Sequence, residues 1–276
     1  MAYKHKIGLV LEGGGMRGLY TAGVMDVMME RGFKPDVISG TSAGVTFGIN
    51  MCSGQQGRVL RYNLRYAGCR EYISLHSLLT TGNIVNVDFA YNQLPCTLDP
   101  FDQAAMDANG IAFYATVTNC LTGKAEYIQV TDCFRQMDVI RASASLPFVS
   151  RPVMMNGVPY LDGGLVDNIP LDYCLENCEQ VFVVLTRPKG YVRNENLVPL
   201  AKLFYPRYHG LHEALRVRDN NYNARVAQLE ALEHEGRITL IRPSQYIKIG
   251  RLESNPTKLQ AMYNLGVQDA ERIGLF

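Results

Sequence analysis

The strongest chemical signal in this chain is a serine between two glycines. Residues 40–44 read Gly-Thr-Ser-Ala-Gly and fit the pattern G-x-S-x-G. In many hydrolases this pattern places a nucleophilic serine on a sharp turn between a strand and a helix. Residues 35–39 (Pro-Asp-Val-Ile-Ser) predict that strand, and an apolar helix follows. Gly40 and Gly44 would leave room for the neighbouring elements, so Ser42 is the candidate nucleophile. The alternative is a serine that caps an ordinary turn.

A serine hydroxyl needs a base at neutral pH, and Asp162 is the first candidate. It follows the extended residues 158–160 and precedes Gly163 and Gly164. We therefore expect Asp162 at the end of a strand, where two glycines keep space around its carboxylate. An aspartate in an ordinary turn is the alternative.

Histidines are the competing bases. His209, His212 and His234 follow Asp162, so the order Ser-Asp-His of an α/β-hydrolase triad is present. All three lie in charged helical segments, and none follows a strand. We interpret them as solvated side chains, and a Ser-His-Asp esterase stays open as an alternative.

A second glycine-rich turn begins at Gly13. Residues 13–18 (Gly-Gly-Gly-Met-Arg-Gly) lie between a predicted strand at 6–11 and a predicted helix at about 17–31. They satisfy the dinucleotide fingerprint G-x-G-x-x-G, so a non-enzymatic nucleotide-binding module is one alternative. The next strand, however, does not end in the acidic residue that would hold a ribose. The backbone N–H groups of three consecutive glycines could instead stabilise a developing oxyanion. A tight turn without a ligand is the third possibility.

The order of predicted elements is that of an α/β fold. Residues 6–52 read β-α-β-α, with a last helix from Ser42 toward Cys52, and this alternation predicts a mostly parallel sheet with helices on its faces. Residues 75–91 and 95–100 predict loops and short turns. Elsewhere we expect helices at 58–66, 137–144, 210–235 and 256–273, strands at 181–185 and 237–241, and a hairpin of strands at 111–119 and 125–130.

Three motifs together are far more specific than any one of them. Residues 13–18, 40–44 and 162–164, in this order, closely resemble the patatin-like phospholipase family, and residues 141–147 (Arg-Ala-Ser-Ala-Ser-Leu-Pro) are similar to the family's segment ahead of the aspartate. The resemblance implies a three-layer α/β/α sandwich. It implies a catalytic core at 6–190 and a mostly helical extension at 191–276, packed on the same domain and similar to that of compact bacterial members.

The resemblance also implies a serine acyl hydrolase, phospholipase A-like, with a Ser-Asp dyad and no histidine. Ser42 would attack an ester carbonyl, and Asp162 would be the general base, first to Ser42 and then to water. Arg17 would support the site nearby. Backbone N–H groups would hold the oxyanion at Gly13, Gly14 and Gly15. Further supporting positions are Gly18, Gly40, Gly44, Gly163 and Gly164.

The expected substrate is a lipid or another carboxylic ester. Arg58, Arg61, Arg65 and Arg70 recur along one stretch, and we interpret them as a solvated helix face rather than a phosphate-binding surface. Segment 191–208 predicts either an interfacial lid or a packed helix. Apolar residues that could line an acyl cleft are Phe47, Leu78, Leu79, Phe89, Phe101, Leu146, Phe148 and Met154.

Bulk composition narrows the remaining possibilities. Hydrophobic residues make up 47% of the 276, enough for a large core, and the formal net charge of +1 gives no electrostatic reason to expect nucleic acid. Seven cysteines without framework spacing predict free thiols, and scattered histidines predict no metal site or cofactor. The N-terminus has no signal-peptide pattern, so we expect a cytoplasmic protein that makes at most transient contact with membranes.

Overall fold

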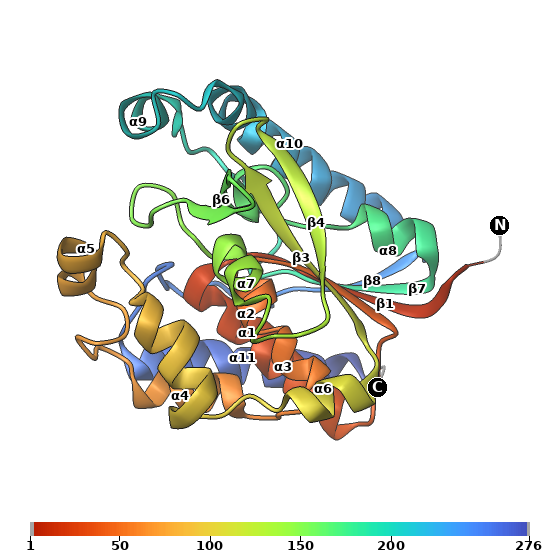
Figure 1. Cartoon of the computed structure of the whole chain (residues 1–276). Coiled ribbons are helices and arrows are strands. Elements are labelled where there is room, and N and C mark those ends of the chain that lie inside the picture. Colours follow the sequence, from red (N-terminus) through yellow and green to blue (C-terminus); the bar gives the residue numbers. More distant parts are fainter. Residues whose placement is uncertain (1–2, 275–276) are drawn as a thin grey trace.

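An eight-stranded, mostly parallel sheet runs through the molecule, with helices on both faces (Figure 1). The computed structural model describes residues 3–274. The three layers make an α/β/α sandwich, as predicted. The strands are β1 (His5–Leu11), β2 (Val37–Thr41), β3 (Ala112–Asn119), β4 (Lys124–Val130), β5 (Val153–Met155), β6 (Val158–Asp162), β7 (Cys178–Val184) and β8 (Ile238–Ile241).

The strand order is β5-β6-β3-β2-β1-β7-β8, and β4 also pairs with β3. All pairs among β1, β2, β3, β7 and β8 are parallel. The pairs made by β4 and β6 are antiparallel, and they include the predicted hairpin of β3 and β4. The antiparallel strands therefore lie together at the β3 end of the sheet.

Helices of the first and last thirds of the chain cover one face, where α1, α4 and α11 contact one another, and α8 and α10 cover the other (Figure 1). The helices are α1 (Leu19–Glu30), α2 (Ala43–Thr46), α3 (Ile49–Cys52), α4 (Arg58–Arg65), α5 (Leu75–Thr81), α6 (Gln103–Asn109), α7 (Met137–Ser143), α8 (Asp172–Asn177), α9 (Val198–Phe204), α10 (His209–His234), α11 (Pro256–Ile273), the 3₁₀ helices η1 (Gly15–Gly18) and η3 (Gly163–Leu165), and the π-helix η2 (Phe89–Leu98).

The side chains of strand β7 pack into apolar clusters on both faces of the sheet. Phe182 and Val184 belong to the apolar cluster on the α1 side, whereas Val181 and Val183 belong to the cluster on the α10 side. Successive side chains of a strand point to opposite faces, so a strand covered on both faces must be apolar throughout. Burial on both faces therefore explains the apolar run at 181–184, although β7 lies next to the edge strand β8 rather than at the centre of the sheet, where the run predicts it.

Two predictions about helices were wrong. The helix predicted from Ser42 to Cys52 is two short helices, α2 and α3, interrupted at Gly48. The predicted loops at 75–91 and 95–100 contain α5 and most of η2. Helix α5 is short and has few buried residues, so it lacks an apolar period. Its signals are an N-terminal cap, where Ser74 Oγ accepts from the Ser77 N–H (3.0 Å), and Gly82 with a φ of +77° at its end.

Candidate active site

Strands β2 and β6 end beside each other on one edge of β3. Strand β4 covers the other edge over residues 113–119, so β2 and β6 must share the remaining one. Thr41, at the end of β2, pairs with residue 116 of β3, and Asp162, at the end of β6, pairs with residue 117. The two strands run in opposite directions, and their carboxyl ends meet. The β3 residues with which these ends pair are consecutive, about 3.3 Å apart along the strand. This register brings Ser42, the residue after β2, next to Asp162.

The two candidate catalytic side chains are hydrogen-bonded. Ser42 Oγ donates to Asp162 Oδ2 at 2.6 Å, although 120 positions separate the residues. Both are buried, with 6% and 4% of their surface exposed. Ser42 has φ +56° and ψ −116°. Such a backbone costs about 1–3 kcal/mol for a residue that is not glycine, so the surrounding structure must hold the turn.

Glycines at the turn are a steric requirement. A Cβ at Gly40 would lie 2.6 Å from the carbonyl oxygen of Gly44, and a Cβ at Gly44 would lie 2.3 Å from that of Leu11. Real Cβ atoms do not approach backbone oxygens so closely. A larger residue at Gly44 would push the serine turn away from β1, and one at Gly40 would push β2 away from the start of α2.

The segment 141–147 supports both residues of the pair. The backbone N–H of Ser42 donates to Ser143 Oγ at 3.0 Å. The backbone N–H of Asp162 donates to the Ser145 carbonyl, also at 3.0 Å. One segment, at the end of α7, thus positions the turn and the strand end at the same time.

The Asp162 carboxyl is held by its own turn. Its Oδ1 accepts a hydrogen bond from the Gly164 N–H at 2.7 Å. Burial raises the pKa of Asp162, while the hydrogen bonds from Ser42 and Gly164 oppose the rise. A Cβ at Gly163 would lie 2.3 Å from the Thr116 carbonyl oxygen, so this turn also needs glycine to lie against β3.

The glycine loop lies against the serine. A Cβ at Gly13 would come within 3.1 Å of the Ser42 Cβ. The Gly13 N–H, however, donates to the Asn168 carbonyl at 3.1 Å. Among residues 3–274, the N–H groups of Gly14 and Gly15 donate to no protein acceptor. Of the three N–H groups predicted to hold an oxyanion, those of Gly14 and Gly15 therefore have no acceptor within the described residues.

Glu12 anchors this loop, a role that sequence reasoning missed. The side chain is 1% exposed. Its carboxylate accepts from Tyr222 Oη at 2.8 Å, from Asn168 Nδ2 at 3.0 Å and from both the N–H and Oγ1 of Thr186. Buried carboxylates are tolerated when hydrogen bonds satisfy all their oxygens. Glu12 thereby ties the loop to the end of β7 and to α10.

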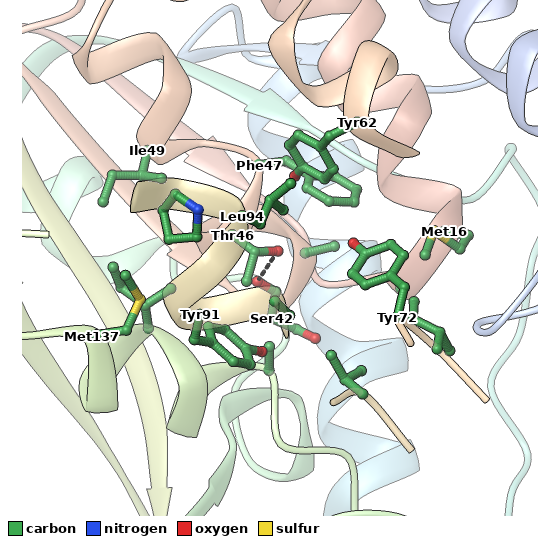
Figure 2. A pocket seen from close by; sticks show the side chains of 18 of the residues that line it. Met16, Ser42, Thr46, Phe47, Ile49, Tyr62, Tyr72, Tyr91, Leu94 and Met137 are labelled. Carbon is green, nitrogen blue, oxygen red and sulfur yellow. Dashed lines mark hydrogen bonds between the residues drawn. The ribbon is translucent and has the colours of Figure 1, made fainter. Parts of the chain in front are cut away.

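An apolar cavity of about 130 Å³ opens beside Ser42. Figure 2 shows Ser42 among the aromatic side chains of Phe47, Tyr62, Tyr72 and Tyr91. Of the apolar residues suggested by the sequence, Phe47, Phe101 and Leu146 line this cavity. The other five suggested residues are not among the lining: Leu78, Leu79, Phe89, Phe148 and Met154.

The three candidate histidines do not line the cavities beside Ser42. Within the described chain, no histidine lines either cavity that contains Ser42. His209 and His234 are exposed, as predicted. His212 is buried, so its prediction was wrong: it lies on the inner face of α10, and its Nε2 contacts the Tyr205 carbonyl at 2.9 Å.

The prediction of a solvated arginine face was wrong for Arg58. Its side chain is buried, donates from Nη1 to Asn50 Oδ1 at 2.6 Å and lies over the rings of Tyr62 and Phe101. Arg61, one turn later, is mostly exposed and pairs with Asp99 at 2.8 Å. Position on the helix, rather than the spacing of like charges, decides which arginine is buried.

The fold and the site define an α/β/α protein with a serine on a strand-to-helix turn, hydrogen-bonded to an aspartate at a neighbouring strand end. The model of the patatin-like phospholipase family matches residues 9–175. This match covers more than half of the chain, which therefore belongs to the patatin-like phospholipase family. A second family model, a domain of unknown function (DUF6363), matches residues 208–273.

Similar proteins include bacterial and fungal sequences. The chain is 33% identical over 186 residues to the uncharacterized protein YjjU of Escherichia coli K12, which covers 65% of the chain and 51% of the relative. It is 31% identical over 169 residues to lysophospholipase nte1 of Aspergillus niger, covering 60% of the chain and 11% of the relative. The match thus spans about half of one relative and a small part of the other. The crystal structure of VipD from Legionella pneumophila is similar over 99% of the chain and 67% of that protein, with 16% identity and a TM-score of 0.47.

Proposed function

We propose that the protein hydrolyses acyl esters of lipids through a Ser42–Asp162 dyad. The observation that carries the proposal is the 2.6 Å hydrogen bond between Ser42 Oγ and Asp162 Oδ2 in a buried site. A carboxylate in direct contact with the hydroxyl can take its proton without an intervening histidine. Membership of the patatin-like phospholipase family supports lipid acyl hydrolysis.

The reaction follows from the positions of these atoms. Ser42 Oγ attacks the ester carbonyl carbon, and its proton passes to Asp162 Oδ2. When the tetrahedral intermediate collapses, the C–O bond to the alcohol breaks and the alcohol leaves with that proton. Water then attacks the acyl-serine ester and gives a proton to Asp162. Release of the carboxylic acid returns the proton to Ser42 Oγ.

We infer that the oxyanion is held by the N–H groups of Gly14 and Gly15. Both are free of protein acceptors within residues 3–274, whereas the Gly13 N–H donates to Asn168. This narrows the predicted set Gly13, Gly14 and Gly15 to two donors. Removing one such donor typically costs about 3 kcal/mol of transition-state stabilisation.

The apolar cavity beside Ser42 is suited to the acyl chain. Its walls are mainly aromatic and aliphatic side chains, and Ser42 is among the residues that line it (Figure 2). Transfer of an acyl chain from water into this cavity would stabilise binding by roughly 0.8 kcal/mol for each buried methylene.

The proposal is tested with a soluble p-nitrophenyl ester. We expect Ser42→Ala and Asp162→Asn each to lose about 10³-fold or more of kcat/KM. Ser254→Ala and Asp107→Asn are matched controls, because both side chains are exposed, and they should retain wild-type rates. A fluorophosphonate probe should label the wild type and not Ser42→Ala. Equal rates for the wild type, Ser42→Ala and Asp162→Asn would sink the proposal.

The two alternatives have their own tests. His209→Ala, His212→Gln and His234→Ala should retain activity if the dyad works without histidine, and a folded variant that loses it would restore the Ser-His-Asp hypothesis. Stabilisation by NAD or ATP in a thermal-shift assay, together with no probe labelling, would favour the nucleotide-binding module.

We also infer that the enzyme meets lipid surfaces through α5 and α9. Leu79 on α5 is 85% exposed and Leu203 on α9 is 74% exposed, and Leu75 and Phe204 are also exposed. Both helices lie on the same side of the molecule (Figure 1). They adjoin the cavity mouth, since Ile73 lines the cavity just before α5 and the ring of Phe204 contacts Phe148, close to the lining residue Leu146. Exposed apolar patches beside a lipid site favour interfacial contact.

A further inference from the structure

A second cavity contains Ser42 and Asp162, and its wall is more polar than that of the first cavity. It measures about 40 Å³. The glycine loop 13–15 forms one side, and four arginines contribute to the rest of the wall: Arg17, Arg193, Arg218 and Arg251. Ser42, Gly15, Leu146 and Arg251 line both cavities, so the polar and apolar cavities meet at the nucleophile.

Two of these arginines lack anionic partners. Arg17 and Arg193 are each 7% exposed. Within the described residues, the Nε atom of each is buried without a hydrogen-bond partner, and neither guanidinium forms an ion pair. The Arg193 guanidinium lies over the Tyr222 ring, with its Cζ 3.6 Å from the ring centroid, and this contact fixes its plane. Buried donors without partners are costly and rare.

The like charges repel one another. Burial, followed by Arg187 and Arg251, lowers the pKa of Arg17 to about 10, so the side chain still carries its charge at neutral pH. Glu12 is the nearby carboxylate, but Asn168, Thr186 and Tyr222 occupy its oxygens. An anion in this cavity would relieve the repulsion.

The other two arginines are positioned by acidic side chains. Glu195 accepts from Arg218 at 3.1 Å and from Arg251 at 2.9 Å, and Asp219 pairs with Arg218 at 3.4 Å. Burial opposes ionisation of Glu195, but its ion pairs lower its pKa to about 2, so it is charged. Arg218 Nε also donates to the Gly164 carbonyl at 3.2 Å, in the turn that holds Asp162. These contacts hold Arg218 and Arg251 at the wall of the cavity.

Three of the four arginines lie outside the patatin-like match. Arg193 follows it, and Arg218 and Arg251 belong to residues 208–273, which match the domain of unknown function. That segment therefore contributes side chains to the cavity that contains the nucleophile. Residues 208–273 thus contribute to the candidate site as well as to the packing of the sheet.

We propose that Arg193, Arg218 and Arg251, with Arg17, form a subsite for an anionic group on the alcohol part of the ester. The acyl chain would lie in the apolar cavity, and the phosphate or carboxylate of the leaving alcohol would lie in the polar one. Guanidinium groups suit this role because they bind such oxygens in pairs of charge-assisted hydrogen bonds. This inference rests on the proposed function and narrows its substrate to anionic esters, with a lysophospholipid as the phosphate form.

The kinetic test compares two esters with the same short acyl chain, a 1-acylglycerol and its 3-phosphate. We expect wild type to prefer the phosphate ester by at least about tenfold in kcat/KM. Arg193→Gln and Arg251→Gln should remove this preference, mainly through KM of the phosphate ester, and Arg193→Lys should restore part of it. Arg216→Gln is the matched control, because Arg216 lies two residues before Arg218 on α10 and is 60% exposed; its preference should equal that of wild type.

A binding test does not depend on turnover. Glycerol 3-phosphate should raise the melting temperature of the Ser42→Ala protein, glycerol should not, and glycerate shows whether a carboxylate is also accepted. Arg193→Gln in the same background should abolish the shift. Equal kcat/KM for the charged and neutral esters, or no shift with either anion, would overturn the subsite while leaving ester hydrolysis intact. If wild type hydrolyses no ester, the proposed function fails, and the melting shift alone decides whether the anion site exists.

Discussion

At the scale of single residues, the proposed role of Asp162 requires a carboxyl group that is basic enough to take a proton and yet can be ionised in a buried site. A carboxylate is a weak base at its ordinary pKa of 3.8, and burial raises that value. The same burial makes the ionised form costly in the folded protein. Hydrogen bonds from Ser42 Oγ and the Gly164 N–H hold the charged form in place. The raised pKa makes Asp162 a stronger base than an exposed aspartate.

The raised pKa predicts an acidic limb in the activity profile. The base form of Asp162 exists above its folded pKa, so kcat/KM should fall as the pH drops through that value. The midpoint should lie above 3.8. It is measured with a soluble ester between about pH 3 and pH 9. The control Asp107→Asn should leave the midpoint unchanged, and a midpoint at or below the ordinary aspartate value would contradict the assignment of Asp162 as base.

At the scale of elements, helices α1 and α11 cross at a contact that only glycine permits. A Cβ at Gly23 would lie 2.2 Å from the Tyr263 carbonyl oxygen, and a Cβ at Gly266 would lie 2.1 Å from that of Tyr20. Both helices would have to separate to accept a methyl group. This contact packs α1, which follows the glycine loop, against α11. It therefore joins the first third of the sequence to the last third.

Gly266→Ala should therefore destabilise the protein by about 1–3 kcal/mol, although alanine is favoured over glycine by about 1 kcal/mol within a helix. The free energy of unfolding in urea measures the effect. Gln268→Ala, at an exposed position two residues later, is the control and should change it little. A Gly266→Ala protein as stable as wild type would show that the two helices can separate at little cost.

At the scale of the whole molecule, helices α5 and α9 lie on the same side and carry exposed leucines (Figure 1). Leu75 and Leu79 contribute little to the core, so changing them should not unfold the protein. Within residues 3–274, no helix has both the length and the apolar character to cross a bilayer. Lipid contact through α5, as proposed above, can be tested at Leu75 and Leu79 because both are exposed.

Leu75→Asp with Leu79→Asp should lower hydrolysis of esters in anionic vesicles by about tenfold, because charged side chains resist entry into the interface. Hydrolysis of a soluble p-nitrophenyl ester should stay at the wild-type rate. Leu121→Asp is the matched control, since Leu121 is 52% exposed between β3 and β4. An equal loss with both substrates would mean that α5 affects the site itself rather than lipid contact.

Some properties of the whole molecule stay predictions. These are the division into a core at 6–190 and an extension at 191–276, and the cytoplasmic location. In the structure, β8 joins the sheet next to β7, and α11 packs on α1. The extension therefore contributes a strand and a covering helix to the same sandwich.

The sequence by itself determined the elements around the site and the two candidate residues. Glycines at 40 and 44 are required by close backbone contacts, and the apolar run of β7 is required by burial on both faces. The sequence patterns are local, because turn glycines and apolar runs can be recognised within a few positions, although the contact that Gly44 makes with Leu11 is not local. That is why the β-α-β-α opening and the strand end at Asp162 could be predicted.

Only the tertiary structure decided which distant side chains meet. Ser42 and Asp162 come together because β2 and β6 end on consecutive residues of β3, and strand order and register cannot be deduced from a local pattern. The same reason applies to the arginines of the polar cavity, which come from η1, a loop, α10 and a second loop. Burial of His212 and Arg58 likewise depends on which helix face meets the core, and charged neighbours in the sequence conceal that face.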